Sequence, residues 1–287
     1  MKKIVMLGCE NSHADTFLTI MKNNPDKYRD IEVIGVYSEE PEAMDRVCAT
    51  FGVPAMKSCD EAVGVADGVV ITARHGGKHY PYARPYIQSG APMFIDKPIT
   101  VDEEEAIRFM RECREAGVRV TGGSCCKYAA EITDMKTKIN PEEIRGGLVR
   151  APINMDNPYG GFFFYSQHLV EMLGELFGLY PRSVRAHRAG NNVNVVFSYD
   201  GCDVTGLYTE FSWLYFVSAA LNGQTLASDA TIGTDCFTRE LDEFCDLLRG
   251  GEQTVTYEDF IAPVFTLNAI HRSLESGEEE AVHTYEV

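Results

Sequence analysis

Residues 68–73 read Gly-Val-Val-Ile-Thr-Ala, a near-continuous apolar run that ends in a polar stretch. Comparable short runs occur along the first part of the chain, at residues 3–8, 31–37, 93–95 and 118–121. Helical patterns lie between them, at about residues 13–22, 43–51, 82–87 and 103–116. Strands that are apolar on both faces and alternate with helices indicate a parallel sheet covered on both sides. Because parallel crossovers are right-handed, residues 1–122 are predicted to form a doubly wound α/β domain.

The pattern changes after Gly122-Gly123. Strand-like stretches at residues 146–155 and 182–223 contain the turn signals Asp200-Gly201 and Asn222-Gly223, which are typical of antiparallel hairpins. Helical patterns follow, at about residues 238–249 and 257–276. Residues 123–287 are therefore predicted to form a second, α+β domain with a mostly antiparallel sheet.

Composition excludes several classes of partner. The net charge of −17 argues against nucleic acid or an anionic membrane, since both select for basic surfaces. No run reaches the roughly 18 apolar residues of a membrane helix, and the apolar start is too short for a signal peptide. A cytoplasmic protein is expected. The odd number of cysteines, nine, favours free structural thiols over disulfides.

The turn after the first strand reads Gly8-Cys9-Glu10-Asn11-Ser12-His13. A dinucleotide fingerprint, G-x-G-x-x-G, needs glycines where backbone approaches a pyrophosphate, and here Glu10 and His13 stand at the second and third positions. The helix that follows still offers its N-terminus to an anion. Ser12 is predicted to cap that helix, with Asp15 three residues later completing a capping box.

The end of the second strand carries Ser38, where an acidic residue normally binds the ribose hydroxyls. Glu39 comes one residue late, and no arginine is close in the sequence to hold a 2′-phosphate. NAD is therefore expected in preference to NADP. The alternative for Glu39 and Glu40 is a pair of solvated charges at a helix start.

Asp96-Lys97-Pro98 directly follows the buried run 93–95. A lysine at this point lies at the carboxyl edge of the sheet, where α/β sheets bind ligands. Lys97 could therefore donate a hydrogen bond to a substrate oxygen, the alternative being an exposed loop lysine.

With these motifs in place, the chain resembles the glucose–fructose oxidoreductase / inositol dehydrogenase (Gfo/Idh/MocA) family. Asp96-Lys97-Pro98 matches its E-K-P signature, and residues 51–54, 66–71, 102–106 and 269–277 match further conserved-looking segments of the family pattern. The resemblance implies a Rossmann domain that binds a nicotinamide cofactor, followed by a substrate domain. It implies hydride transfer between nicotinamide and a sugar, cyclitol or similar polyhydroxylated substrate.

The resemblance also implies the roles of individual residues. Lys97 would polarise the substrate oxygen, and His168 would exchange its proton as general acid or base. Phe164 stands where the family has an aspartate, so the orientation of the imidazole is expected to differ. The cofactor-binding residues implied are Gly8, Glu10, Asn11, Ser12, His13, Ser38, Thr72, Ala73, Arg74, His79, Asp96 and Lys97.

Three further expectations concern the site and the assembly. The aromatic run 162–164 is expected to form the wall of the gap between Lys97 and His168. Strands rich in Val195, Val196, Phe197, Leu207, Tyr208, Phe211 and Trp213 suggest an apolar sheet face, and therefore a homo-oligomer, either a dimer or a tetramer. The rival hypothesis is a protein that keeps this fold but acts as a sensor, a binding protein or a redox-neutral enzyme such as a lyase.

A metal site is the remaining alternative. His75 and His79 are four residues apart and, with Glu10, His13 or His168, have ligand chemistry for a metal. Gly76-Gly77 makes the segment between them a loop, so no metal is expected.

Overall fold

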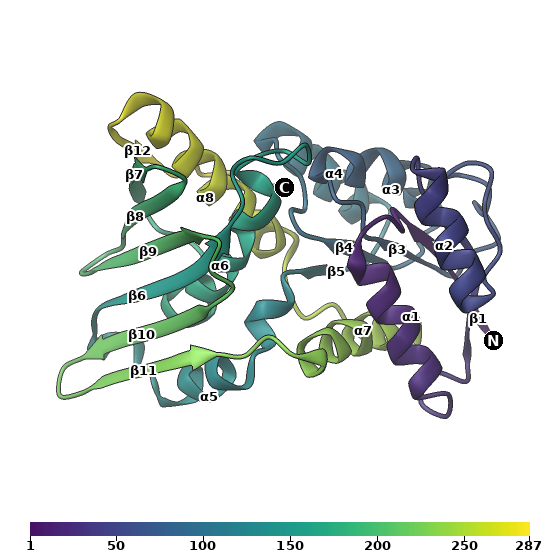
Figure 1. Cartoon of the computed structure of the whole chain (residues 1–287), viewed down its shortest axis with the longest axis horizontal. Coiled ribbons are helices and arrows are strands. Elements are labelled where there is room, and N and C mark those ends of the chain that lie inside the picture. Colours follow the sequence, from purple (N-terminus) through teal and green to yellow (C-terminus); the bar gives the residue numbers. More distant parts are fainter.

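The computed structural model describes residues 1–287 and shows two sheets, each packed against helices and lying side by side (Figure 1). The N-terminal sheet has five parallel strands in the order β2-β1-β3-β4-β5. An isolated parallel bridge between Val36 and Ala55 adds a rudimentary strand outside β2, which gives the 3-2-1-4-5-6 order of a Rossmann sheet. The strands are β1 (Lys2–Leu7), β2 (Ile31–Tyr37), β3 (Gly68–Ile71), β4 (Met93–Asp96) and β5 (Val120–Gly123).

Four helices connect these strands, and their ends follow from local sequence. α2 begins at a proline, whose missing N–H costs nothing there, and ends at Gly52 with a positive φ of 73°. α4 begins after Asp102, whose side chain accepts a hydrogen bond of 2.7 Å from the amide of Glu105. The helices are α1 (Ser12–Asn23), α2 (Pro41–Phe51), α3 (His79–Ile87) and α4 (Glu103–Glu115).

The second sheet has seven strands in the order β11-β10-β6-β9-β8-β7-β12. Every neighbouring pair is antiparallel except β6 and β9, so the predicted α/β and α+β combination is confirmed. Its strands are β6 (Ile144–Ile153), β7 (Ser183–Ala189), β8 (Asn192–Ser198), β9 (Asp203–Glu210), β10 (Tyr215–Leu221), β11 (Thr225–Ala230) and β12 (Glu279–Ala281). Its helices are α5 (Ala130–Lys138), α6 (Phe163–Phe177), α7 (Thr234–Leu248) and α8 (Tyr257–Ser276).

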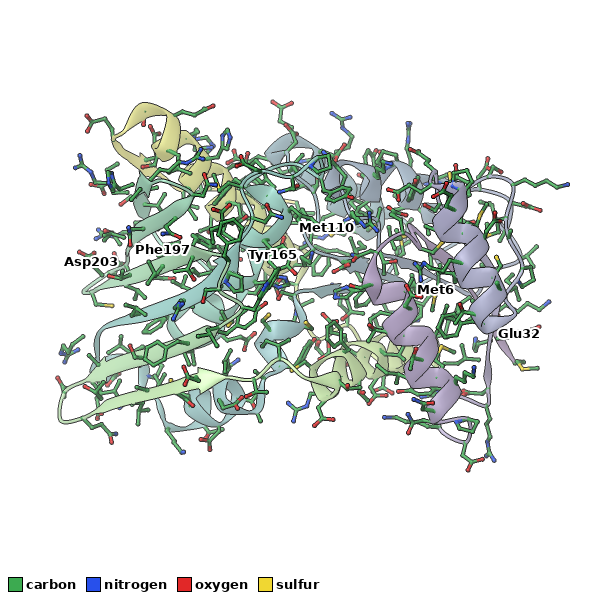
Figure 2. The ribbon with its side chains drawn as sticks, viewed as in Figure 1. Met6, Glu32, Met110, Tyr165, Phe197 and Asp203 are labelled. Carbon is green, nitrogen blue, oxygen red and sulfur yellow. The ribbon has the colours of Figure 1, made fainter.

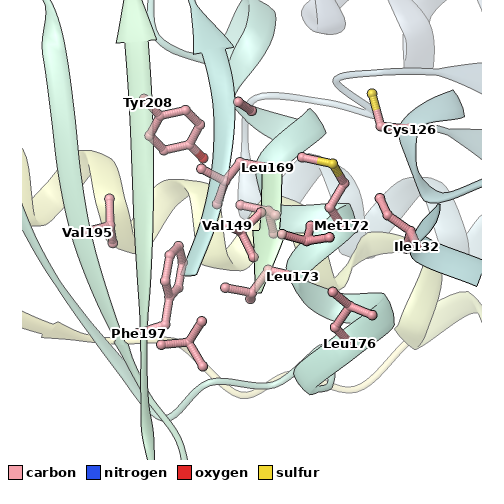
Figure 3. Close-up of a cluster of buried hydrophobic side chains, with 14 of the residues drawn as sticks. Cys126, Ile132, Val149, Leu169, Met172, Leu173, Leu176, Val195, Phe197 and Tyr208 are labelled. Carbon is pink, nitrogen blue, oxygen red and sulfur yellow. The ribbon is translucent and has the colours of Figure 1, made fainter. Parts of the chain in front are cut away.

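Only alternate residues of this sheet face its helices. Val195, Phe197 and Tyr208 are fully buried and pack toward Leu169 and Leu173 of α6 (Figure 3). Their strand neighbours Val196 and Leu207 therefore point to the opposite face, because side chains alternate along a strand. The expectation that all seven of these apolar residues form one outer face is wrong, since three of them build the core.

The last two helices return to the first sheet. Leu241 and Phe244 of α7 share a buried cluster with Phe17 of α1 and Phe94 of β4. Phe260 and Phe265 of α8 belong to a second buried cluster, which covers the opposite face of the parallel strands. Residue 122 lies within β5, the last strand of the first sheet, and the helices α7 and α8 pack back across this point. A domain boundary there stays a prediction. No helix combines the length and the apolar character needed to cross a bilayer.

Candidate functional site

The ends of β1 and β3 meet at a very close backbone contact. Gly8 has a φ of +88°, and a Cβ placed on it would lie 2.2 Å from the backbone nitrogen of Ala73. The hydroxyl of Thr72 donates to the carbonyl of Gly8 at 3.1 Å. Only glycine fits here, and the contact fixes the loop 8–13 against the carboxyl edge of the sheet.

Glu10 turns its carboxylate toward the end of β2. The hydroxyl of Ser38 donates to its Oε2 at 2.7 Å, and the amide of Arg74 donates to its Oε1 at 3.2 Å. Glu10 is only 4% exposed. The loop after β1 thus supplies the acid that Ser38 does not provide at the end of β2.

Two cations also lie at this edge: Arg74, which the family resemblance placed among the cofactor-binding residues, and Lys78, which the sequence did not reveal. The guanidinium of Arg74 donates to Tyr159 Oη at 2.8 Å and to the carbonyl of Glu10, and it lies 3.7 Å from Glu40. Lys78 donates to Glu39 at 2.8 Å. The expectation that no arginine lies close enough to hold a 2′-phosphate is therefore wrong, because the fold brings Arg74 to this edge. Each of the two cations, however, already faces a carboxylate.

The N-terminus of α1 has no side-chain cap. Asn11 holds the N-cap position without accepting from the helix, and Ser12 merely donates to the side chain of Asn11 at 3.4 Å. Asp15 instead pairs with Arg46. The predicted capping box is wrong, and the first-turn amides remain available to an anion.

Asp96 is the buried centre of the loop network. Its Oδ2 accepts from Asn11 at 2.9 Å and lies 2.6 Å from His13 Nδ1, while its Oδ1 accepts from the amide of Lys97 at 2.6 Å. Burial alone would raise the pKa of Asp96, but His13 and Lys97 hold the pKa below its usual value. An ionised Asp96 therefore orients His13 and the lysine loop together.

Lys97 is 5% exposed and forms no direct ion pair with a carboxylate. Its Nζ lies 4.8 Å from the ring centre of Phe164 and 5.3 Å from that of Tyr165, and it makes one long hydrogen bond, 3.4 Å, to the carbonyl of Phe164. Cation–π contacts offset part of the cost of burying the ammonium. Two of its three donors are left for a bound molecule.

His168 faces the same space from α6. Its Nδ1 lies 2.6 Å from Ser124 Oγ and 3.4 Å from Cys126 Sγ. Because Nδ1 is occupied by these partners, proton exchange with a ligand falls to Nε2. Its ring also makes an edge contact with Tyr165, and the Tyr165 ring in turn lies 5.3 Å from Lys97 Nζ, so that Tyr165 contacts both groups.

Lys97 and His168 line one cavity of about 330 Å³. It opens between the two sheets, where Figure 2 places Tyr165. Such a volume suits a single sugar-sized molecule together with part of a cofactor. Its lining comprises Asn11, Ser12, His13, Arg74, Lys97, Cys125, Cys126, Phe164, Tyr165, His168, Tyr215, Ile232 and Phe237.

The aromatic wall differs from the one expected. Phe164 and Tyr165 line the cavity, but Phe162 is buried against Tyr208, and Phe163 stacks on His271. Successive residues of α6 point in directions about 100° apart, so three adjacent phenylalanines do not share one face. Only Phe164 of the run takes part.

The structure also identifies site residues that the sequence analysis missed. Ser124, Tyr165 and Tyr215 had no recognisable pattern, and Cys125 was covered only by the general expectation that the cysteines are structural thiols. Glu240 of α7 is fully buried beside the cavity, and neither of its carboxylate oxygens has a hydrogen-bond partner. Burial raises the pKa of Glu240 well above its usual value.

His79, by contrast, lies outside the cavity. Its Nε2 lies 2.8 Å from the carbonyl of Ala73 and its Nδ1 lies 3.2 Å from that of Ile99. His75 uses its Nδ1 to accept from Gly77. Because both nitrogens of His79 face backbone carbonyls, it braces the loops 73–79 and 96–99 and has no atom free to bind a metal.

A parallel sheet in Rossmann order, joined to a mostly antiparallel sheet with a cavity between them, is an architecture of two-domain dinucleotide-binding proteins. Residues 2–124 match the sequence model of the family described as "Oxidoreductase family, NAD-binding Rossmann fold" (GFO_IDH_MocA). The N-terminal part of the chain thus matches the Gfo/Idh/MocA family model, in agreement with the resemblance seen in the sequence.

Similar proteins support the same fold. Glucose-6-phosphate 3-dehydrogenase of Bacillus subtilis (strain 168) is 24% identical over 147 residues, which cover 50% of this chain and 39% of that protein. The scyllo-inositol dehydrogenase of Lactobacillus casei, solved with NAD(H) and scyllo-inositol, superposes with a TM-score of 0.83 at 14% identity, covering 99% of this chain and 100% of that one. The myo-inositol 2-dehydrogenase of Lactobacillus plantarum has a TM-score of 0.84 at 12% identity, covering 98% and 99%.

Proposed function

We propose that this protein is an NAD-linked dehydrogenase that acts on a sugar, a cyclitol or a similar small polyhydroxylated molecule. The observation that carries the proposal is the convergence of Lys97 and His168, from different domains, on one cavity. The family match and the dehydrogenases of the same fold support it.

The residues at the carboxyl edge suit a dinucleotide. The uncapped N-terminus of α1 offers amides to the pyrophosphate, and Gly8 lets the backbone lie close to Ala73. Glu10, held by Ser38, would accept from the ribose hydroxyls at the end of β2. The nicotinamide, when bound, supplies the site that accepts or gives up the hydride.

Lys97 and His168 divide the remaining chemistry. The ammonium of Lys97 would donate to the reacting oxygen and stabilise negative charge on it. Nε2 of His168 would take the hydroxyl proton during oxidation and return it during reduction, while Ser124 holds the other ring nitrogen. Phe164 and Tyr165 would exclude water from the ammonium, which strengthens its interaction with that oxygen.

The proposal is tested by binding and turnover together. NADH is titrated by fluorescence, and NAD⁺ reduction is followed with a panel of inositols and hexoses. Lys97→Met should lower kcat/KM by about 10²–10⁴-fold and leave the Kd for NADH nearly unchanged, since only a contact to the reacting oxygen is lost. Lys138→Met, which removes an exposed lysine on α5, is the control. Absence of both NADH binding at millimolar concentration and turnover would favour the redox-neutral rival.

Preference for NAD over NADP is the finer part of this proposal. The carboxylates of Glu10 and Glu39 lie at the end of β2, and the nearby cations Arg74 and Lys78 already face carboxylates. A 2′-phosphate would therefore meet net repulsion. NADH should bind at least 10-fold more tightly than NADPH in parallel titrations, and equal affinities would contradict this assignment.

A further inference from the structure

Three metal-ligating side chains meet beside the cavity. They are His13 at the start of α1, Cys125 in the 3₁₀ turn after β5, and Glu240 in the middle of α7. One ligand atom from each lies within 4.8 Å of the other two, and all three residues are buried. Segments more than 100 residues apart in the sequence thus bring an imidazole, a thiol and a carboxylate to one point.

Glu240 is the member of this group whose burial is not explained by any neighbouring hydrogen-bond partner. It is 0% exposed and has no hydrogen-bond partner on either oxygen. Lys127, the nearby cation, already donates to the carbonyl of Gly122 at 2.6 Å and pairs with Glu171 at 3.1 Å. A buried carboxylate without a partner is costly, and a bound cation would remove that cost.

His13 is held in the orientation that metal-bound histidines commonly have. Its Nδ1 lies 2.6 Å from the buried carboxylate of Asp96, which leaves Nε2 to coordinate an ion. Asp96 is itself fixed by Asn11 and the amide of Lys97. A carboxylate behind the imidazole sets the ring orientation and makes the free nitrogen a stronger ligand.

We propose that His13, Cys125 and Glu240 bind a divalent transition-metal ion of the Zn²⁺ class at the wall of this cavity. Imidazole, thiolate and carboxylate are ligands that zinc accepts, and three protein ligands leave one position open. Tetrahedral bonds of about 2.0–2.3 Å would place ligand atoms about 3.3–3.8 Å apart, so the side chains need to close by only roughly 1 Å. His13 and Cys125 also line the cavity, so the open position is accessible to an oxygen of a molecule bound there.

Cobalt is the most direct probe, since Co²⁺ occupies zinc sites and reports its ligands by colour. The full chain, freed of metal by a chelator, is titrated with Co²⁺ and then with Zn²⁺. We expect one Co²⁺ per chain, a thiolate-to-cobalt charge-transfer band, loss of that band when Zn²⁺ displaces the ion, and a rise in Tm with Zn²⁺. Absence of stoichiometric binding, or binding without the thiolate band, overturns the proposal. The readout does not depend on turnover, so it is separate from the test of dehydrogenase activity.

Single substitutions test whether each of the three proposed residues binds the ion. Cys125→Ser should abolish the band, and Glu240→Gln and His13→Asn should each weaken Co²⁺ binding at least 100-fold. Matched controls are Cys245→Ser, a buried thiol of α7 in another cluster, and Glu243→Gln, a carboxylate of α7 bonded to Thr121 and Tyr128. Both controls should bind like the wild type. Unchanged binding in Cys125→Ser or Glu240→Gln refutes the site.

Discussion

Ser124 is placed to control the orientation of His168. Its Oγ lies 2.6 Å from Nδ1 of the imidazole and accepts from the amide of Cys126 at 3.2 Å. In this arrangement the serine contacts the proposed acid–base group and not the substrate. Phe164 cannot replace it, because a phenyl ring offers the imidazole no hydrogen bond.

Ser124→Ala should therefore lower kcat about 10-fold or more while KM stays within 2-fold, and it should shift the pH profile of kcat. The proposed loss arises from a mobile imidazole, so substrate affinity is spared. Ser166→Ala removes a buried hydroxyl of α6 that has no hydrogen-bond partner and serves as the control. An unchanged pH profile, or equal losses in both variants, would contradict a positioning role.

Gly8 provides a second prediction at the residue scale. Gly8→Ala combines a φ of +88° with a clash of 2.2 Å against Ala73, whereas Gly64→Ala meets a φ of +78° with nothing within 4 Å. We expect a loss of about 1 kcal/mol for Gly64→Ala and of about 3 kcal/mol or more for Gly8→Ala in urea unfolding. Similar losses would show that the close approach of the two loops is relaxed in solution.

Lys97 could be placed from the sequence because the strand before it and the proline after it lie in one short segment. Glu240 and Ser124 could not, because their surroundings come from distant segments. Along α7, Glu240 resembles the acidic residues around it, and it is buried where α7 packs against residues 125–128 and α1. Burial of a polar residue by tertiary contacts leaves no local pattern.

α7 shows how an element outside the first 122 residues completes the N-terminal core. Its apolar side packs on α1, while its C-terminal half is joined to the loop before β2 by ion pairs. Arg249 donates to both carboxylate oxygens of Asp30, at 2.9 and 2.8 Å, and Lys27 pairs with Asp242 at 2.6 Å.

Arg249→Gln tests the contribution of this contact and its pH dependence. The hydrogen bonds from Arg249 lower the pKa of Asp30 to about 2, below the roughly 3.9 of an unfolded aspartate. A lowered pKa stabilises the folded state above about pH 4, and this contribution disappears as the pH falls toward 2. Because both side chains are partly exposed, we expect only about 0.5–1 kcal/mol at pH 7.

The measurement is urea unfolding of the wild type and the variant between pH 7 and pH 2.5. The difference in unfolding free energy should be constant from pH 7 to about pH 4.5 and should shrink below pH 4. Lys138→Met, at an exposed pair of α5, controls for general loss of a positive charge. A difference in unfolding free energy that grows on acidification would contradict the expected direction of the pH dependence.

The strands and helices of the first domain were predictable because each has a strong period of its own. The apolar run at residues 31–37 coincides with β2, and the run at residues 68–73 contains β3, which ends two residues earlier. In the second part of the chain, the pattern at residues 257–276 coincides with α8. β11 and α5 were not predicted. Both are short and have few buried apolar residues. Their structure is therefore specified by packing against neighbouring elements, and the local sequence pattern does not reveal it.

At the scale of the whole molecule, the cavity exists because α6 of one domain faces β4 and the loop after it in the other. Sequence alone indicated both sides, through Lys97 and His168, but gave no information on how far apart they lie. Distance between domains depends on the packing of α7 and α8 across the boundary, which many weak contacts determine together.

The outer face of the seven-stranded sheet leads to the last prediction. α5, α6 and α8 lie on one face (Figure 1), and the other carries Leu148, Val196, Leu207 and Phe216 among polar residues such as Arg150. We predict that this face joins copies of the chain into a dimer or tetramer, since burial of such a surface is favourable. Light scattering should give a multiple of 31.9 kDa for the wild type and about that mass for the double variant Leu207→Glu, Phe216→Glu. Val65→Glu, at an exposed apolar residue of the other domain, should leave the assembly intact. A monomeric wild type at micromolar concentration would rule the interface out, and dissociation by Val65→Glu would place it elsewhere.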